Sequence, residues 1–146
     1  MEDKNLTACK KAGSRLTVYT DGASRGNPGE AGAGAVIFDE SGGEIYARGK
    51  YLGQCTNNMA EYQALIMGLA ALKDHGAENI SIFLDSELIV RQLQGRYKVK
   101  DQKLKPLFIE VSTLLNEFTA WEVRHVPRNE NKRADELANL GIDEKL

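Results

Sequence analysis

The order of apolar runs limits the fold of this chain more than any other feature of its sequence. Five β-branched or aromatic runs read as strands, at residues 15–20, 33–39, 44–52, 80–84 and 121–126. Glycine- and asparagine-rich turns join the first three, which are expected to form an antiparallel meander. Amphipathic stretches separate the others, and right-handed crossovers of that kind make the first, fourth and fifth strands parallel.

Four stretches carry the pattern of amphipathic helices, at residues 59–75, 87–93, 104–118 and 132–140. The triplet Thr56-Asn57-Asn58 supplies N-cap residues for the first of them. Residues 21–34, rich in Gly, Asn and Pro, are expected to form an irregular loop. The order βββαβααβα therefore predicts an α/β fold, with a five-stranded mixed sheet of order 3-2-1-4-5 flanked by helices.

Composition fits one domain at residues 15–146 behind a flexible leader at residues 1–14. The leader lacks an apolar signal region, and no apolar run is long enough to span a bilayer, so we expect a cytoplasmic monomer without a membrane partner. Two free thiols, Cys9 and Cys55, are expected in that compartment. A net charge of −2 argues against a whole-surface nucleic-acid binder, yet residues 96–105 carry five basic side chains and one acid.

Four acidic residues stand at predicted junctions between these elements. Asp21 and Asp85 end two strands expected to be parallel neighbours, so their side chains should meet at one edge of the sheet. Glu61 and Asp135 lie in the first turns of two helices that could face the same edge. Each acid also has a structural interpretation, as a turn residue, as part of a capping box or as a complement to a helix dipole.

A cluster of these four carboxylates would need a counter-charge, because like charges in contact raise each other's pKa. Hard oxygen ligands suit Mg²⁺ or Mn²⁺, and the chain has no C-x-x-C motif for structural zinc. Two such ions can clamp an in-line phosphoryl displacement. The sequence therefore predicts metal-dependent phosphodiester chemistry.

Four motifs resemble type 1 ribonuclease H, in the order that this family has: DGASRGNPG at 21–29, TNNMAE at 56–61, DS at 85–86 and NKRADELA at 131–138. The resemblance implies an endonuclease that cuts the RNA strand of RNA/DNA hybrids with two Mg²⁺ ions, leaving 5′-phosphate and 3′-hydroxyl ends. It implies that the metal ligands are Asp21, Glu61, Asp85 and Asp135.

The resemblance also implies residues that bind the substrate. The expected readers of the minor groove are Ser24, Arg25, Gly26, Asn27, Asn57, Asn58 and Gln63. Hydroxyl and amide groups suit the RNA 2′-OH, which distinguishes RNA from DNA. Thr56 and Asn57, together with Arg91, are candidates for holding a phosphate of the DNA strand. Because residues 94–105 form a short basic segment, the chain resembles the branch of the family without a longer basic handle.

The accessory catalytic residue is open between two candidates. His125 stands ten residues before Asp135, at the family spacing of a catalytic histidine, but inside a predicted strand. Arg128 lies in the following loop, a position that favours it. Two other functions also remain open. A non-catalytic nucleic-acid-binding module would keep the fold and lose the acids, and a phosphatase for small esters would have no use for the reader residues.

Overall fold

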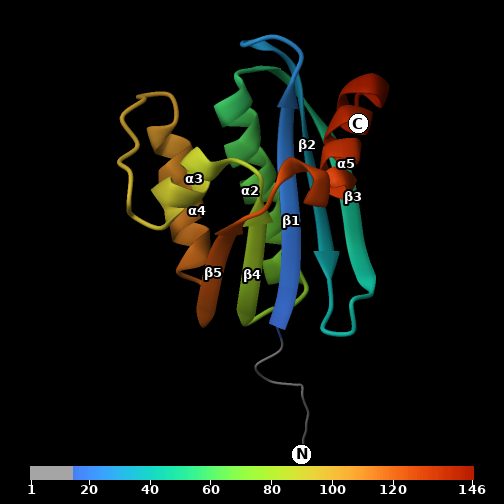
Figure 1. Cartoon of the computed structure of the whole chain (residues 1–146), viewed down its shortest axis with the longest axis vertical. Coiled ribbons are helices and arrows are strands. Elements are labelled where there is room, and N and C mark those ends of the chain that lie inside the picture. The colour runs from blue at the N-terminus through green and yellow to red at the C-terminus, as the bar shows by residue number, and fades with distance from the viewer. Residues whose placement is uncertain (1–14) are drawn as a thin grey trace, which may run out of the picture.

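The computed structural model describes residues 15–146 and contains one five-stranded mixed sheet (Figure 1). Its strands are β1 Arg15–Ser24, β2 Gly29–Phe38, β3 Glu44–Cys55, β4 Asn79–Leu84 and β5 Ala120–His125. The order is β3-β2-β1-β4-β5, with an antiparallel meander from β1 to β3 and parallel pairing of β1 with β4 and of β4 with β5. The predicted topology is confirmed. The predicted leader and Cys9 lie outside the described residues, and Cys55 is a buried free thiol.

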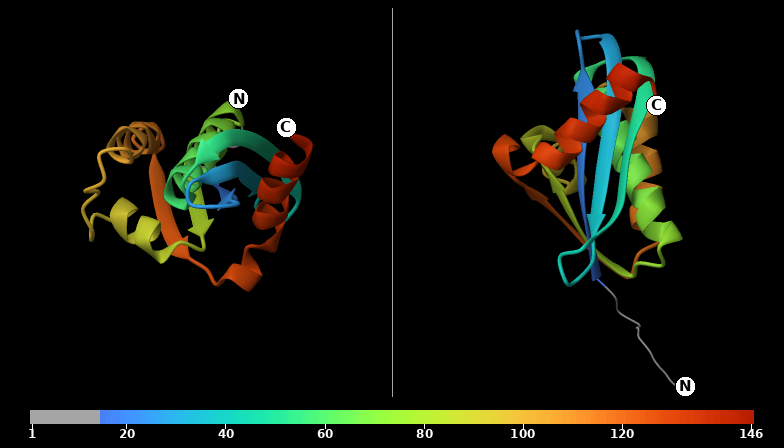
Figure 2. Two further views of the ribbon diagram at one scale, coloured as in Figure 1. Left: turned by 90° about the horizontal axis from the view of Figure 1, so that it is seen from above. Right: turned by 90° about the vertical axis from the view of Figure 1, so that its right-hand side faces the viewer.

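Helices cover both faces of this sheet. They are α2 Asn57–Asp74, α3 Glu87–Leu93, α4 Lys105–Leu115 and α5 Lys132–Glu144, and a short 3₁₀ turn, η1 Arg128–Glu130, precedes α5. Figure 2 shows α2 and α4 on one face and α5 on the other. Within residues 15–146, no helix is long and apolar enough to cross a membrane.

The main core lies between the sheet and the helices α2, α3 and α4. Val18 and Ile82 from the sheet pack there with Leu65 from α2, and all three are fully buried. The buried Tyr62 hydroxyl donates a hydrogen bond of 2.6 Å to Gln92 Oε1, which joins α2 to α3. Because α2 begins at the edge where β1 and β4 end, this packing fixes the start of the helix above those strand ends.

The expectation of an irregular loop at residues 21–34 is wrong. Strand β1 continues to Ser24 and β2 already begins at Gly29. The glycines of β2 serve packing, because a Cβ at Gly32 would lie 2.2 Å from the Ala138 carbonyl oxygen of α5. Glycine inside a strand often marks such a close approach of another backbone. The glycines of β2 therefore lie where the backbone of α5 packs closely against the sheet.

Candidate active site

Three of the four predicted acids meet above the carboxyl ends of β1 and β4. Asp21 comes from β1, Glu61 from α2 and Asp85 from the residue after β4. One ligand oxygen of each lies within 4.8 Å of the other two. Asp21 is only 5% exposed. Side chains 40 and 64 residues from Asp21 in sequence are thus united by the parallel strands and the start of α2.

Gly22 allows this approach of β1 and α2. A Cβ at Gly22 would lie 2.3 Å from the Ala60 carbonyl carbon and 2.4 Å from the Glu61 backbone nitrogen. The Gly22 backbone N–H also donates a hydrogen bond of 3.2 Å to Glu61 Oε1. The residue after Asp21 therefore both makes room for Glu61 and holds its carboxylate.

Asp135 stands beside Asp21, outside the group of three. It lies in the first turn of α5, and its charge acts on Asp21. Asn139, one turn further along α5, donates from Nδ2 to Asp135 Oδ1 at 3.3 Å and to the Asp135 carbonyl at 3.0 Å. The structure therefore brings all four predicted acids to one place, with Asp135 reaching it from the opposite face of the sheet.

Asn131, which sequence reasoning did not single out, connects these elements. It is 1% exposed, and its Nδ2 donates to the Thr20 carbonyl at 2.9 Å and to Asp85 Oδ2 at 3.3 Å. It also precedes α5 as its N-cap residue. Its position in the NKRAD motif was the available signal, but an Asn before a helix is usually a cap and needs no further role.

The electrostatics of the cluster fit a cation bound by oxygen ligands. Burial raises the pKa of Asp21, and the charges of Glu61 and Asp85 raise it further. Burial likewise raises the pKa of Glu61, and the charge of Asp85 raises it further. A hard divalent cation such as Mg²⁺ or Mn²⁺ would offset this repulsion with the oxygen ligands that it prefers.

We expect the metal-free protein to lose stability as pH rises. Folded Asp21 and Glu61 keep their protons to higher pH than in the unfolded chain, where carboxyl groups ionise near pH 4. The folded state therefore binds more protons, and the free energy of unfolding falls above about pH 4. In chelator, Tm should drop by roughly 5 °C or more between pH 5 and pH 8.

Added Mg²⁺ should remove most of that drop, because it binds the ionised carboxylates of the folded state. Thermal melts with and without chelator at both pH values measure this. The Asp21→Asn variant is the control, since it lacks one of the two carboxyl groups and should show a smaller drop. Equal pH dependence in the two proteins would contradict the assignment of the effect to this cluster.

Of the predicted reader residues, residues 24–27 form the tip of the β1–β2 hairpin, and Asn57 begins α2 beside them. Ser24 Oγ lies within hydrogen-bonding distance of the Cys55 carbonyl, at 2.8 Å, and of the Gly26 carbonyl, and can donate its one proton to either. Asn27 Oδ1 accepts from the Asn57 backbone N–H at 3.1 Å. These bonds hold the hairpin tip against the end of β3 and the start of α2.

Thr56 and Arg25 have structural partners at this end of the molecule. Thr56 Oγ1 accepts from the Met59 backbone N–H at 3.2 Å and so caps α2. Arg25 pairs with Asp143 at 2.6 Å and donates to Asn139 Oδ1 at 3.1 Å. Because Asn139 also holds Asp135, a hydrogen-bonded chain runs from the reader hairpin to the acidic centre.

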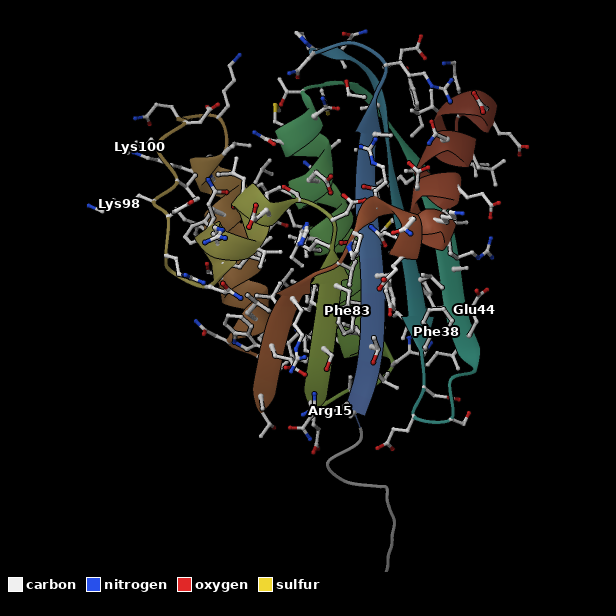
Figure 3. All side chains as sticks on the ribbon, viewed as in Figure 1. Arg15, Phe38, Glu44, Phe83, Lys98 and Lys100 are labelled. Atoms are coloured by element: carbon white, nitrogen blue, oxygen red, sulfur yellow. The ribbon has the colours of Figure 1, made fainter. Side chains whose placement is uncertain are left out.

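The other predicted binding residues lie on α2, on α3 and in the connection between α3 and α4. Asn58 is half-buried in the first turn of α2, and Gln63 lines a groove between α2 and β3. The basic segment forms most of the connection between α3 and α4, where Lys98 and Lys100 project away from the sheet (Figure 3). Arg91 is bound by Glu87 at 2.5 Å.

The two candidates for the accessory residue point to different places. Arg128 begins η1, and its charge lowers the pKa of Glu61, so it acts on the acidic centre. His125 ends β5 and lines a hollow with Glu87 and three arginines, on the far side of β4 from Asp21.

Buried carboxylates above the carboxyl ends of two parallel strands, in a sheet of order 3-2-1-4-5, define the ribonuclease H class of fold. Residues 19–141 match the family model described as "Reverse transcriptase-like". The Halobacterium salinarum protein "Ribonuclease HI" is 43% identical over 132 residues, which are 90% of this chain and 66% of that protein. The chain belongs to the ribonuclease H family.

Solved structures agree with this assignment. RNase H1 from Halobacterium salinarum superposes with a TM-score of 0.87 over 89% of this chain and 98% of that one, at 43% identity. LC11-RNase H1, solved in complex with an RNA/DNA hybrid, superposes with a TM-score of 0.85 over 89% of this chain and 98% of that one, at 44% identity. The chain spans about two thirds of the full halobacterial protein and 36% of matching mycobacterial proteins.

Proposed function

We propose that residues 15–146 form an endoribonuclease domain that hydrolyses the RNA strand of RNA/DNA hybrids. The observation that carries the proposal is the convergence of Asp21, Glu61 and Asp85 within 4.8 Å, with Asp135 beside them. These carboxylates would hold two Mg²⁺ or Mn²⁺ ions with substrate bound. Such ions activate an attacking water and stabilise the leaving oxygen. Departure of the 3′-oxygen leaves 3′-hydroxyl and 5′-phosphate ends.

Residues of the chain itself would position the hybrid. The hydroxyl of Ser24 and the amides of Asn27 and Asn57 lie where a minor groove could reach them. Hydrogen bonds from Ser24 Oγ to the Cys55 carbonyl and from the Asn57 backbone N–H to Asn27 Oδ1 hold these side chains in place. Hydroxyl and amide groups both donate and accept, as recognition of the RNA 2′-OH requires. The neighbouring Thr56 would bind a phosphate of the DNA strand, and Lys98 and Lys100, in the connection between α3 and α4, would add positive charge.

A substrate panel tests the proposal. Labelled hybrid, duplex RNA and duplex DNA of one sequence are incubated with the protein in Mg²⁺, in Mn²⁺ and in chelator. We expect cleavage of the hybrid alone, confined to the RNA strand and dependent on metal, with 5′-phosphate ends. Hybrid binding without cleavage would instead favour a non-catalytic module. Faster turnover of a small phosphate ester would favour a phosphatase.

We further propose that Arg128, rather than His125, is the accessory catalytic residue, since its charge reaches Glu61. Arg128→Ala should lower kcat about 10- to 100-fold with little change in KM, because a fixed cation near the scissile phosphate stabilises charge that develops in the transition state. His125→Ala should leave kcat within about twofold. Steady-state kinetics of both variants decide the matter, and the reverse pattern would assign the role to His125.

A further inference from the structure

Outside the acidic centre, cationic side chains gather around a hollow of about 260 Å³ between α3 and β5. Its charged lining consists of Arg91, Arg96, Arg124 and Glu87, and His125 lies beside them. Strand β5 is an edge strand of the sheet, so this side of the hollow faces solvent. This lining differs from that of a core pocket, which is apolar. It also differs from an ordinary surface, where positive and negative side chains balance one another.

The backbone around the hollow is held by hydrogen bonds. Gln94 Nε2 donates to the Val123 carbonyl of β5 at 3.2 Å, which ties the end of α3 to the strand. After α3 the chain turns at Gly95, which has a φ of 78°, and the backbone N–H groups of Arg96 and Tyr97 donate to the Arg91 carbonyl at 2.9 and 3.3 Å. The turn thereby brings Arg96 back beside Arg91.

The single carboxylate of the lining cannot neutralise these cations. Glu87 is bonded to Arg91 at 2.5 Å, and the charge of Arg96 also acts on it. Arg96 has no ion-pair partner of its own among residues 15–146. Arg124 uses Nε to bind Glu122 at 3.1 Å and keeps its terminal nitrogens for another acceptor. An anionic ligand would therefore find at least two guanidinium groups available.

The hollow lies next to the proposed cleavage centre. His125 is paired in register with Leu84, the residue directly before Asp85. Glu87 follows Asp85 by two residues, which limits the separation of their Cα atoms to about 7 Å. A nucleic-acid strand whose scissile phosphate lies at Asp85 would thus carry neighbouring phosphates past the hollow.

We propose that this hollow binds a backbone phosphate of the RNA strand close to the cut, which rests on the proposed function. Guanidinium groups match the geometry of phosphate oxygens and bind them with two parallel hydrogen bonds. Contacts of this kind fix the register of a strand without reading its sequence. The hollow would complement the reader hairpin, which lies at the opposite, β1–β2 side of the acids.

Kinetics of a double variant, Arg96→Gln with Arg124→Gln, test the proposal. KM for hybrid should rise about tenfold with kcat within twofold, and the slope of log KM against log salt should flatten by about 1. Arg48→Gln with Lys50→Gln is the matched control, since it removes the same charge from β3, the opposite sheet edge. Arg96→Lys with Arg124→Lys keeps the charge and should restore part of the lost affinity. A double variant that behaves like its control overturns the proposal.

Binding without turnover separates this proposal from the proposed function. In chelator, amide signals of residues 96 and 124–125 are followed by NMR while hybrid or inorganic phosphate is added to the wild-type protein. We expect both ligands to shift these signals and to compete with each other. If phosphate shifts them but hybrid neither shifts them nor competes, the site is one for free phosphate. If neither ligand acts, the hollow is not a phosphate site, whether or not the protein cleaves hybrids.

Discussion

Replacing Asp21 by Asn is expected to lower hybrid turnover by about 10³-fold while the domain stays folded. Removing a residue that only hydrogen-bonds a metal ligand typically lowers metal affinity or activity about 10- to 100-fold. Loss of a buried ligand itself should lower activity more. Asn keeps the size of the side chain, and Asp21 is enclosed by β1, α2 and the other acids. Because burial and two neighbouring charges oppose ionisation of Asp21, a neutral side chain should also stabilise the metal-free fold above neutral pH.

Turnover of labelled hybrid in Mg²⁺ and thermal melts in chelator at pH 8 measure the two effects. The matched control is Asp74→Asn, which changes an exposed carboxylate at the far end of α2. That variant should retain wild-type turnover and Tm. Near-normal turnover in Asp21→Asn would remove Asp21 from the catalytic centre. A lower Tm at pH 8 would show that its carboxylate stabilises the fold by a contact outside the cluster.

The acids of the centre could be predicted because each follows from local sequence together with a general rule. Asp21 and Asp85 follow recognisable apolar runs, and the carboxyl ends of parallel strands meet at one edge of a sheet, although β1 itself continues to Ser24. Glu61 and Asp135 lie at helix starts that the motifs identify. The strand order followed equally well from the turns and crossovers, since connection length limits how strands pair.

What local sequence did not reveal depends on contacts between distant segments. Asn131 has the sequence of an ordinary cap, and only the fold shows that its amide reaches Thr20 and Asp85. The glycines of β2 have the sequence of a loop, and only the position of α5 shows why a strand contains them. In both cases the reason for the residue lies at least 46 residues away in sequence, beyond the range of periodicity or turn rules.

Replacing Gly34 by Ala tests that explanation and is expected to destabilise the domain by about 3 kcal/mol, a drop in Tm of roughly 10 °C. A Cβ at Gly34 would lie 2.1 Å from the Ala134 carbonyl oxygen and 2.7 Å from the Ala138 backbone nitrogen, so α5 would have to move. Gly34 pairs with Asp21 across β1 and β2, and Asp135 follows Ala134. The same displacement should therefore withdraw Asp135 from Asp21 and lower turnover even in molecules that remain folded.

Thermal melts, and hybrid turnover measured well below the lowered Tm, separate the two consequences of this substitution. Gly43→Ala is the matched control, because its Cβ would lie 3.4 Å from the nearest atoms, an ordinary contact, so Tm should stay within about 2 °C. Unchanged Tm in Gly34→Ala would mean that α5 does not pack closely against the glycines of β2. Lower Tm with full turnover would mean that Asp135 keeps its position when the helix moves. Hydrogen bonds such as those from Asn139, and not the packing of α5 on the sheet, would then set that position.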